Sequence, residues 1–201
     1  MKICSGDMLE RNQGFTLIEV LITMVVLAIG LLGLALLQAT SLNNQLEAYH
    51  RAQAILLLEE MSNRIRVSSD GALAGVYADA ANFGQRSLDD FGLDAGQDCL
   101  DIIDNAPLRD LCEWNYALEG AAVTLEKGDG SVTNMGSVNG AIGCIENIAG
   151  SAYGEAIVRL TIAWQGMAKT AAPASLCGQG AFGEDEFRRV ASIDTVIASL
   201  D

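Results

Sequence analysis

The chain has 201 residues, enough for one modest globular domain beside one long apolar helix. It carries 26 Asp and Glu residues against 12 Lys and Arg residues, which gives a formal net charge of −14 at pH 7. This acidic balance argues against nucleic-acid binding by the body of the protein, because contacts to phosphate need Lys and Arg. The high hydrophobic fraction is inflated by the N-terminal apolar run and says little about the remainder.

The segment of residues 1–14 is short and carries charges of both signs: Lys2 and Arg11 are basic, and Asp7 and Glu10 are acidic. This segment has no apolar core of its own, so it does not match an ordinary secretory signal. The apolar segment follows it instead. The basic residues favour a cytoplasmic location for residues 1–14.

An apolar run extends from Phe15 to Leu37 without proline, and its polar side chains are Thr16, Glu19 and Thr23. As a helix it spans roughly 35 Å, enough to cross a hydrocarbon core of ~30 Å. A charged group on such a helix costs several kcal/mol unless it is paired, which makes Glu19 a functional candidate. The alternative is that Glu19 lies near the membrane surface and reaches water.

The helical pattern continues through residues 38–67, which contain neither Gly nor Pro. Apolar residues recur there at helical spacing, namely Leu42, Leu46, Tyr49, Leu56 and Ile65. We therefore predict one helix from about Phe15 to Arg66, whose second half packs one face on a globular domain, starting at residues 55–58. Glu47 and Arg51 are spaced for an i, i+4 ion pair. The single histidine, His50, is interpreted as a solvated helix residue rather than a catalytic one.

The cluster at residues 68–71 predicts the end of this helix, and residues 71–97 are predicted to connect it to a sheet. Aspartates crowd the next region: Asp89, Asp90, Asp94, Asp98, Asp101 and Asp104. A calcium site is conceivable there, but the EF-hand spacing is absent, so we favour a solvated acidic loop and expect no metal. Residues 106–118 predict a short helix with Pro107 in its first turn and Trp114 in the core.

Four strands are predicted after this helix, at residues 121–126, 141–148, 156–164 and 187–200. The third shows the strongest pattern, with apolar residues alternating on a β-branched background. A turn is expected at residues 127–130 and a long loop at residues 165–185. Because the strands follow one another after the long helix, we expect an antiparallel sheet packed on that helix, an α+β fold.

Four cysteines lie beyond the apolar run: Cys99, Cys112, Cys144 and Cys177. Their even number predicts two disulfides in an oxidising compartment, and their spacing matches no zinc pattern. Three connectivities are possible. We favour Cys99–Cys112 with Cys144–Cys177, because sequential pairing closes local loops, while free buried thiols remain the alternative. Cys4 stands apart, ahead of the apolar run.

The stretch Gly14-Phe15-Thr16-Leu17-Ile18-Glu19, followed by the apolar run, resembles the processing site of type IV prepilins. In that family a membrane peptidase cuts after the glycine, and the new N-terminal phenylalanine is N-methylated. The resemblance therefore implies cleavage between Gly14 and Phe15 and methylation of Phe15. The new amine would then neutralise the Glu19 carboxylate, within one chain or between neighbouring subunits, and so favour one axial register.

The chain as a whole resembles a minor pilin of the PilV type. The motif from Gly14 to Gln38 carries this resemblance, together with residues 47–66 and, more loosely, Trp114 and a strand ending at Trp164. Major pilins usually have a proline in the apolar run, and this chain has none. Gln13 also replaces the basic residue often found before the glycine.

This resemblance implies a type IV pilin-like fold and a structural role: priming pilus assembly, with a position in the fibre near the tip, in support of twitching motility and adhesion. The implied parts are a cleaved leader (1–14), a transmembrane and assembly half of the helix (15–37), an amphipathic half (38–67) and a periplasmic domain (68–201). The implied partners are other minor and major pilins, prepilin peptidase, the inner membrane and the pilus assembly platform. The protein would be anchored in the inner membrane before it enters a surface pilus.

Other classes of function remain to be weighed. A pseudopilin of a type II secretion system shares the N-terminus and the fold. A membrane-tethered enzyme is disfavoured, because the sequence has no G-x-S-x-G motif, no second histidine and no P-loop, and no cofactor is expected. A signal-anchored periplasmic domain, with Gly14 left uncut, is the remaining alternative.

Overall fold

The computed structural model describes residues 14–77, 80–94, 97–120, 124–126, 128, 132–134, 138, 140–150 and 155–198. The chain divides into two compact units, residues 1–44 and residues 45–201. The second unit contains the sheet and the core, and the first contains the apolar run.

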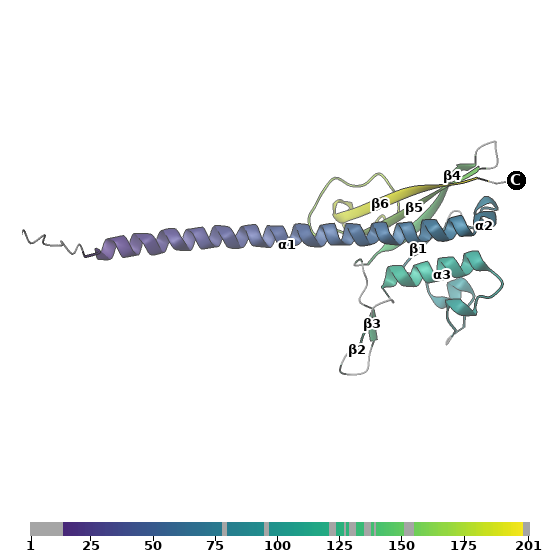
Figure 1. Cartoon of the computed structure of the whole chain (residues 1–201), viewed down its shortest axis with the longest axis horizontal. Coiled ribbons are helices and arrows are strands. Elements are labelled where there is room, and N and C mark those ends of the chain that lie inside the picture. Colours follow the sequence, from purple (N-terminus) through teal and green to yellow (C-terminus); the bar gives the residue numbers. More distant parts are fainter. Residues whose placement is uncertain are drawn as a thin grey trace, which may run out of the picture. The chain divides into compact units, whose positions relative to one another are not determined.

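Helix α1 runs without interruption from Leu17 to Val67, 51 residues, as predicted (Figure 1). It begins where the carbonyl and hydroxyl oxygens of Thr16 accept the Glu19 N–H at 3.1 and 3.4 Å. Its first turn holds Glu19 and its last turn holds Arg64 and Arg66. These charges complement the helix dipole at both ends, which stabilises a helix of this length.

The second half of α1 packs on the core through one face, which consists of Ala54, Leu57, Leu58, Met61, Ser62 and Ile65. The spacing of three and four residues is that of one helical stripe. Of the predicted stripe only Ile65 belongs to it. Leu46, Tyr49 and Leu56 are 45%, 53% and 57% exposed. This half of α1 therefore has two apolar stripes. The buried one includes the small residue Ala54, and the exposed one includes Leu46, Tyr49 and Leu56.

The main sheet has four antiparallel strands in the order β1-β4-β5-β6. They are β1 (Ala80–Phe83), β4 (Ile142–Gly150), β5 (Glu155–Gln165) and β6 (Arg188–Ala198). The three long strands confirm the predictions at 141–148, 156–164 and 187–200, although residues 199–200 lie outside the described part. A long N-terminal helix followed in the chain by an antiparallel sheet is the expected α+β, pilin-like architecture.

Two details of the strand prediction are wrong, and a third lies outside the described residues. Strand β1 lies inside the predicted connection 71–97, and its alanine-rich sequence carries little strand preference of its own, so pairing with β4 makes it a strand. Strand β2 (Thr124–Glu126) pairs with β3 (Val132–Asn134), a strand that was not predicted, in a separate two-stranded sheet. The expected strand start at 121–123 and most of the turn at 127–130 lie outside the described residues.

The shorter helices are α2 (Ser69–Leu73), η1 (Leu88–Phe91), η2 (Cys99–Asp101), α3 (Ala106–Glu119) and η3 (Asp185–Phe187). Helix α1 ends at the predicted cluster 68–71, but a single residue, Ser68, separates it from α2. Helix α3 confirms the prediction: the Asn105 side chain accepts the Leu108 N–H at 3.1 Å, and Gly120 ends the helix with φ = 80°.

Aspartates in the acidic region bind the backbone next to them. The Asp98 carboxylate accepts the Leu100 N–H at 2.7 Å, and the Asp101 carboxylate accepts the Asp98 N–H at 2.8 Å. This capping box fixes η2. Within the described residues no group of three or more His, Cys, Asp and Glu side chains is arranged to hold a metal ion.

The main core lies between α1, α3 and the inner face of the sheet, and Trp114 is its largest buried side chain. Trp114 is 1% exposed, and its Nε1–H donates to the Leu57 carbonyl at 3.2 Å. Its ring centroid lies 5.2 Å from that of Phe83 on β1. Trp114 thus joins both helices to the edge of the sheet, as expected of a core anchor.

A smaller core on the outer face of the sheet is covered by the loop between β5 and β6. It contains Ile142, Cys144, Ala163 and Cys177. The sulfur atoms of Cys144 and Cys177 are 2.03 Å apart, and those of Cys99 and Cys112 are 2.06 Å apart, so the favoured sequential pairing is the one present. Each closed loop removes entropy from the unfolded chain worth about 3–4 kcal/mol.

A polar cluster joins the end of α1 to α3. The Tyr77 hydroxyl donates to the Asp110 carboxylate at 2.9 Å, and Arg64 forms ion pairs with Glu60, Glu113 and Asp110. Burial, followed by the neighbouring Asp110 charge, raises the pKa of Tyr77 to about 12. The Asp110 carboxylate is therefore stabilised from two sides, by the charge of Arg64 and by a hydrogen bond from the neutral Tyr77 hydroxyl.

We expect Trp114→Ala to lower the free energy of unfolding by about 3–5 kcal/mol, because it leaves a large cavity between α1, α3 and β1. Tyr49→Ala, on an exposed face of α1, should change it by less than about 0.5 kcal/mol. Urea unfolding followed by circular dichroism measures both. Equal midpoints for Trp114→Ala and the parent protein would show that Trp114 is not the anchor.

The raised pKa of Tyr77 makes stability depend on alkaline pH. A phenol whose pKa is higher in the folded than in the unfolded state stabilises the fold below pH 10, and this contribution is lost as pH rises from about 10 to 12. The parent protein should therefore lose more stability than Tyr77→Phe between pH 9.5 and 11.5 in thermal unfolding. Parallel losses in the two proteins would contradict this assignment.

Candidate assembly site

The Gly14–Phe15 peptide bond lies just ahead of α1, in backbone that is not helical. Phe15 is 84% exposed, and no atom of another element lies near the position of a Gly14 side chain. The bond therefore lies outside the helix, beside an exposed Phe15 side chain. The same residues were singled out from the sequence as the processing site.

Glu19 lies one turn into the chain beyond Phe15, and the described part of the chain gives its carboxylate no ion-pair partner. The sequence contains no Lys or Arg between Gly14 and His50, so the next cation along the helix is Arg51, about 48 Å away. The helix dipole at this end contributes ~0.3–1 kcal/mol to an anion. That is less than the several kcal/mol that an apolar medium costs an unpaired carboxylate.

The part of the chain that the structure describes leaves the apolar run uncovered. Every residue from Gly14 to Leu46 is exposed, and an 18-residue window of α1 has a mean hydropathy of 2.9 with none of it buried. Burying a Leu, Ile or Val side chain is worth about 1.5–3 kcal/mol. A surface of this extent requires lipid or other helices around it. By length and composition α1 is able to cross a membrane.

The polar side chains of the run are compatible with such cover. The Thr23 hydroxyl donates to the Val20 carbonyl at 2.8 Å, and the Thr40 hydroxyl donates to the Leu36 carbonyl at 3.0 Å. Both hydroxyl groups are thereby satisfied inside the helix. Gly30 and Gly33 have open space beside them, which permits close approach by another helix. Glu19 is the one ionisable side chain of the run.

Other polar clusters hold segments of the second unit together. Glu47 does not pair with Arg51 as its spacing predicts. It accepts from Arg189 on β6 at 2.6 Å and from the Met167 N–H at 3.2 Å. Arg188 is 1% exposed and donates to the Asp185 carboxylate and to the carbonyl of Cys177. Sequence reasoning missed both arginines. Glu47 lies 142 residues from Arg189, and Arg188 binds backbone carbonyls as well as the nearby Asp185.

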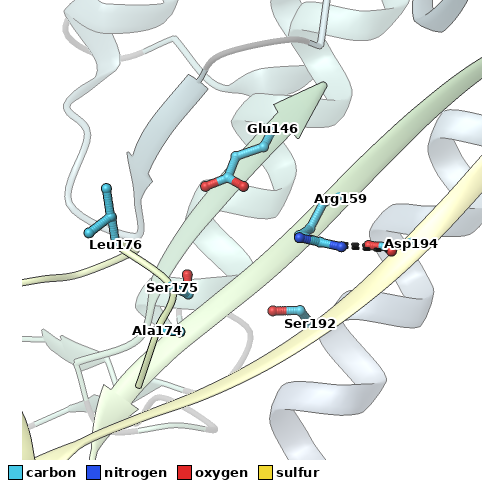
Figure 2. Close-up of a pocket in the computed structure, with 7 residues that line it drawn as sticks. All are labelled: Glu146, Arg159, Ala174, Ser175, Leu176, Ser192 and Asp194. Carbon is cyan, nitrogen blue, oxygen red and sulfur yellow. Dashed lines mark hydrogen bonds and ion pairs between the residues drawn. The ribbon is translucent and has the colours of Figure 1, made fainter. Parts of the chain in front are cut away.

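A groove of about 560 Å³ lies on the outer face of the sheet, lined by Glu146, Arg159, Asp194, Ser192 and residues 174–176 (Figure 2). Arg159 binds Asp194 through two hydrogen bonds of 2.8 and 2.9 Å. This pairing holds the pKa of the Asp194 carboxyl below its usual range. Arg159 and Asp194 thus pair with one another across two adjacent strands.

The family model of the prokaryotic N-terminal methylation motif matches residues 10–35. Searches of curated proteins and of solved structures found no match to the chain. The matched residues contain Gly14, Phe15, Glu19 and most of the apolar run. With the α+β architecture, the motif indicates a type IV pilin-like or pseudopilin-like protein and suggests a structural subunit.

Because every residue from Gly14 to Leu46 is exposed, a shortened chain starting at Gln45 should fold without detergent. We expect it to stay monomeric in solution and to melt within about 3 °C of the full chain measured in detergent. The full chain without detergent serves as the control and should aggregate through its apolar run. Aggregation of the shortened chain, or a melting temperature lower by more than about 10 °C, would contradict this division of the chain.

Proposed function

We propose that this protein is a minor pilin of a type IV pilus, of the PilV type, that primes pilus assembly and is incorporated in the fibre near its tip. In this role it supports twitching motility and adhesion. One observation carries the proposal: a single unpaired carboxylate, Glu19, lies four residues beyond Phe15 on an exposed apolar helix within the methylation motif. The absence of proline from the apolar run supports a minor rather than a major subunit.

The proposed pathway starts at the inner membrane. The apolar half of α1 inserts, and the C-terminal domain stays in the periplasm, where an oxidising environment suits the two disulfides. Prepilin peptidase then cuts between Gly14 and Phe15 and leaves an amine on Phe15. N-methylation of this amine keeps its positive charge.

Assembly follows from charge pairing in an apolar medium. As the new subunit enters the bundle of helices formed by the other minor and major pilins, its Glu19 carboxylate meets the Phe15 amine of a neighbour. Two charges at contact in a low dielectric attract strongly, whereas each alone is costly there. Only one axial offset between neighbouring helices brings them together. The pair thus sets the register in which the assembly platform adds the subunit.

A type II secretion pseudopilin is the second candidate, because the methylation motif and the α+β architecture suit it equally. The two functions differ in the assembly that contains the protein. Cells with an intact pilus system but no secretion system should still carry the protein in sheared surface fibres if the pilus proposal holds. Its absence from those fibres would favour the pseudopilin.

We expect Glu19→Ala to leave the membrane level and the removal of residues 1–14 unchanged, and to reduce the protein in sheared fibres by at least tenfold. The reason is that the neighbouring amine then remains unpaired in an apolar environment. Immunoblots of membrane and fibre fractions measure both quantities. Glu59→Ala, which removes an exposed carboxylate from the same helix, is the matched control and should enter fibres normally. Normal incorporation of Glu19→Ala would count against the pairing.

A further inference from the structure

The two edges of the main sheet are built differently. Strand β1, at one edge, has four residues, a register irregularity and a left-handed residue, Asn82, with φ = 65°. Short, irregular edges of this kind are how proteins prevent unwanted strand pairing. Strand β6, at the other edge, has 11 residues and pairs with β5 in unbroken register from Glu155↔Ala198 to Gln165↔Arg188.

The outer edge of β6 lacks these protective features. It has no proline, and no described strand pairs with it. The backbone N–H and C=O groups on that side are therefore available for a further strand. The first residues are engaged elsewhere: Arg189 binds Glu47, and the preceding Phe187 carbonyl accepts the Gly166 N–H at 2.7 Å. Farther along, the engaged groups are side chains: the hydroxyl groups of Thr195 and Ser62 on α1 are 2.6 Å apart, and α2 also contacts β6. The free edge extends over residues 190–198.

The core beneath this edge is also incompletely covered. Leu160 and Ile162 on β5 are fully buried, whereas their register partners on β6, Ile193 and Ala191, are only partly buried. A further strand would cover the exposed sides of Ile193 and Ala191. Val196 on the other face is 56% exposed. The edge thus offers apolar area as well as hydrogen-bonding groups.

The charges on the outer face specify what the further strand should carry. Glu146, Arg159 and Asp194 are direct cross-strand partners on β4, β5 and β6, and their signs alternate along this row (Figure 2). Asp194 ends the row with its side chain 46% exposed. Opposite charges on adjacent strands stabilise pairing and like charges oppose it. A basic residue therefore fits best beside Asp194.

We propose that β6 is an interaction edge that accepts an extended segment of a partner protein, with a Lys or Arg of that segment beside Asp194. Main-chain hydrogen bonds would provide the affinity, and the charge row would provide the register. A second copy of this chain fits less well. Two β6 strands paired antiparallel about Ile193 would place Ser192, not a base, beside Asp194, and each copy carries a net charge of −14.

The proposal is tested by hydrogen exchange on the full-length protein in nanodiscs. The probe is a synthetic peptide with the sequence of β5, Glu155–Gln165, because its arginine is already matched in register to Asp194. The control peptide has glutamate in place of that arginine. We expect the first peptide to slow exchange in residues 188–198 and nowhere else, and the control peptide to bind about fivefold more weakly.

Two protein variants separate the edge from general charge effects. Asp194→Lys should reverse the preference between the two peptides. Glu146→Lys makes the same charge change in the same row, two strands from the edge, and should leave the preference as it is. Thermal unfolding of both variants checks that the sheet remains intact.

Unchanged exchange in residues 188–198, or equal binding of the two peptides, would overturn the proposal. Faster exchange in β5 would also overturn it, because the peptide would then be replacing β5. Dimerisation of the protein through β6 in sedimentation would identify a second copy as the occupant and contradict the proposed partner. None of these results depends on incorporation into a fibre, so the inference is independent of the proposed function.

Discussion

The Glu19 carboxylate lies on an apolar helix that offers it no cation, and this constraint explains the organisation of the first unit. The nearest Lys or Arg along α1 is Arg51, and every residue from Gly14 to Leu46 is exposed in the described part of the chain. Under the proposed function, this helix is completed by an apolar surrounding and an external positive charge. A neighbouring helix of the same kind, cut after Gly14, would supply both, because the same helix carries a free N-terminal amine and apolar side chains.

The second unit is a stable body attached to that helix. The buried stripe of α1 from Ala54 to Ile65 forms one wall of the core, and Trp114 joins it to α3 and β1. Two disulfides and the buried Arg188 fix the segments with little regular structure. The exposed surface is therefore held in a defined arrangement. A long edge such as β6 is available for a partner only if the sheet behind it does not rearrange.

Local pattern was enough to predict the long helix, α3, the three long strands and the sequential cysteine pairs. Each depends on periodicity, capping or short loop closure within one segment. The errors concern contacts between distant segments. Strand β1 forms because β4 is beside it, the sheet chooses between two apolar stripes on α1, and Glu47 meets Arg189 rather than Arg51. The roles of Gly14, Phe15 and Glu19 stay predictions, because they depend on a peptidase and on other subunits.

The account depends most directly on the state of the N-terminus in the assembled fibre. Mass spectrometry of the protein recovered from sheared pili measures cleavage, methylation and location together. We predict a mature chain that starts at Phe15 and carries one methyl group on its amine. Recovery of the protein only from membranes, with Met1 still attached, would contradict the account, because no free amine would then exist to meet Glu19.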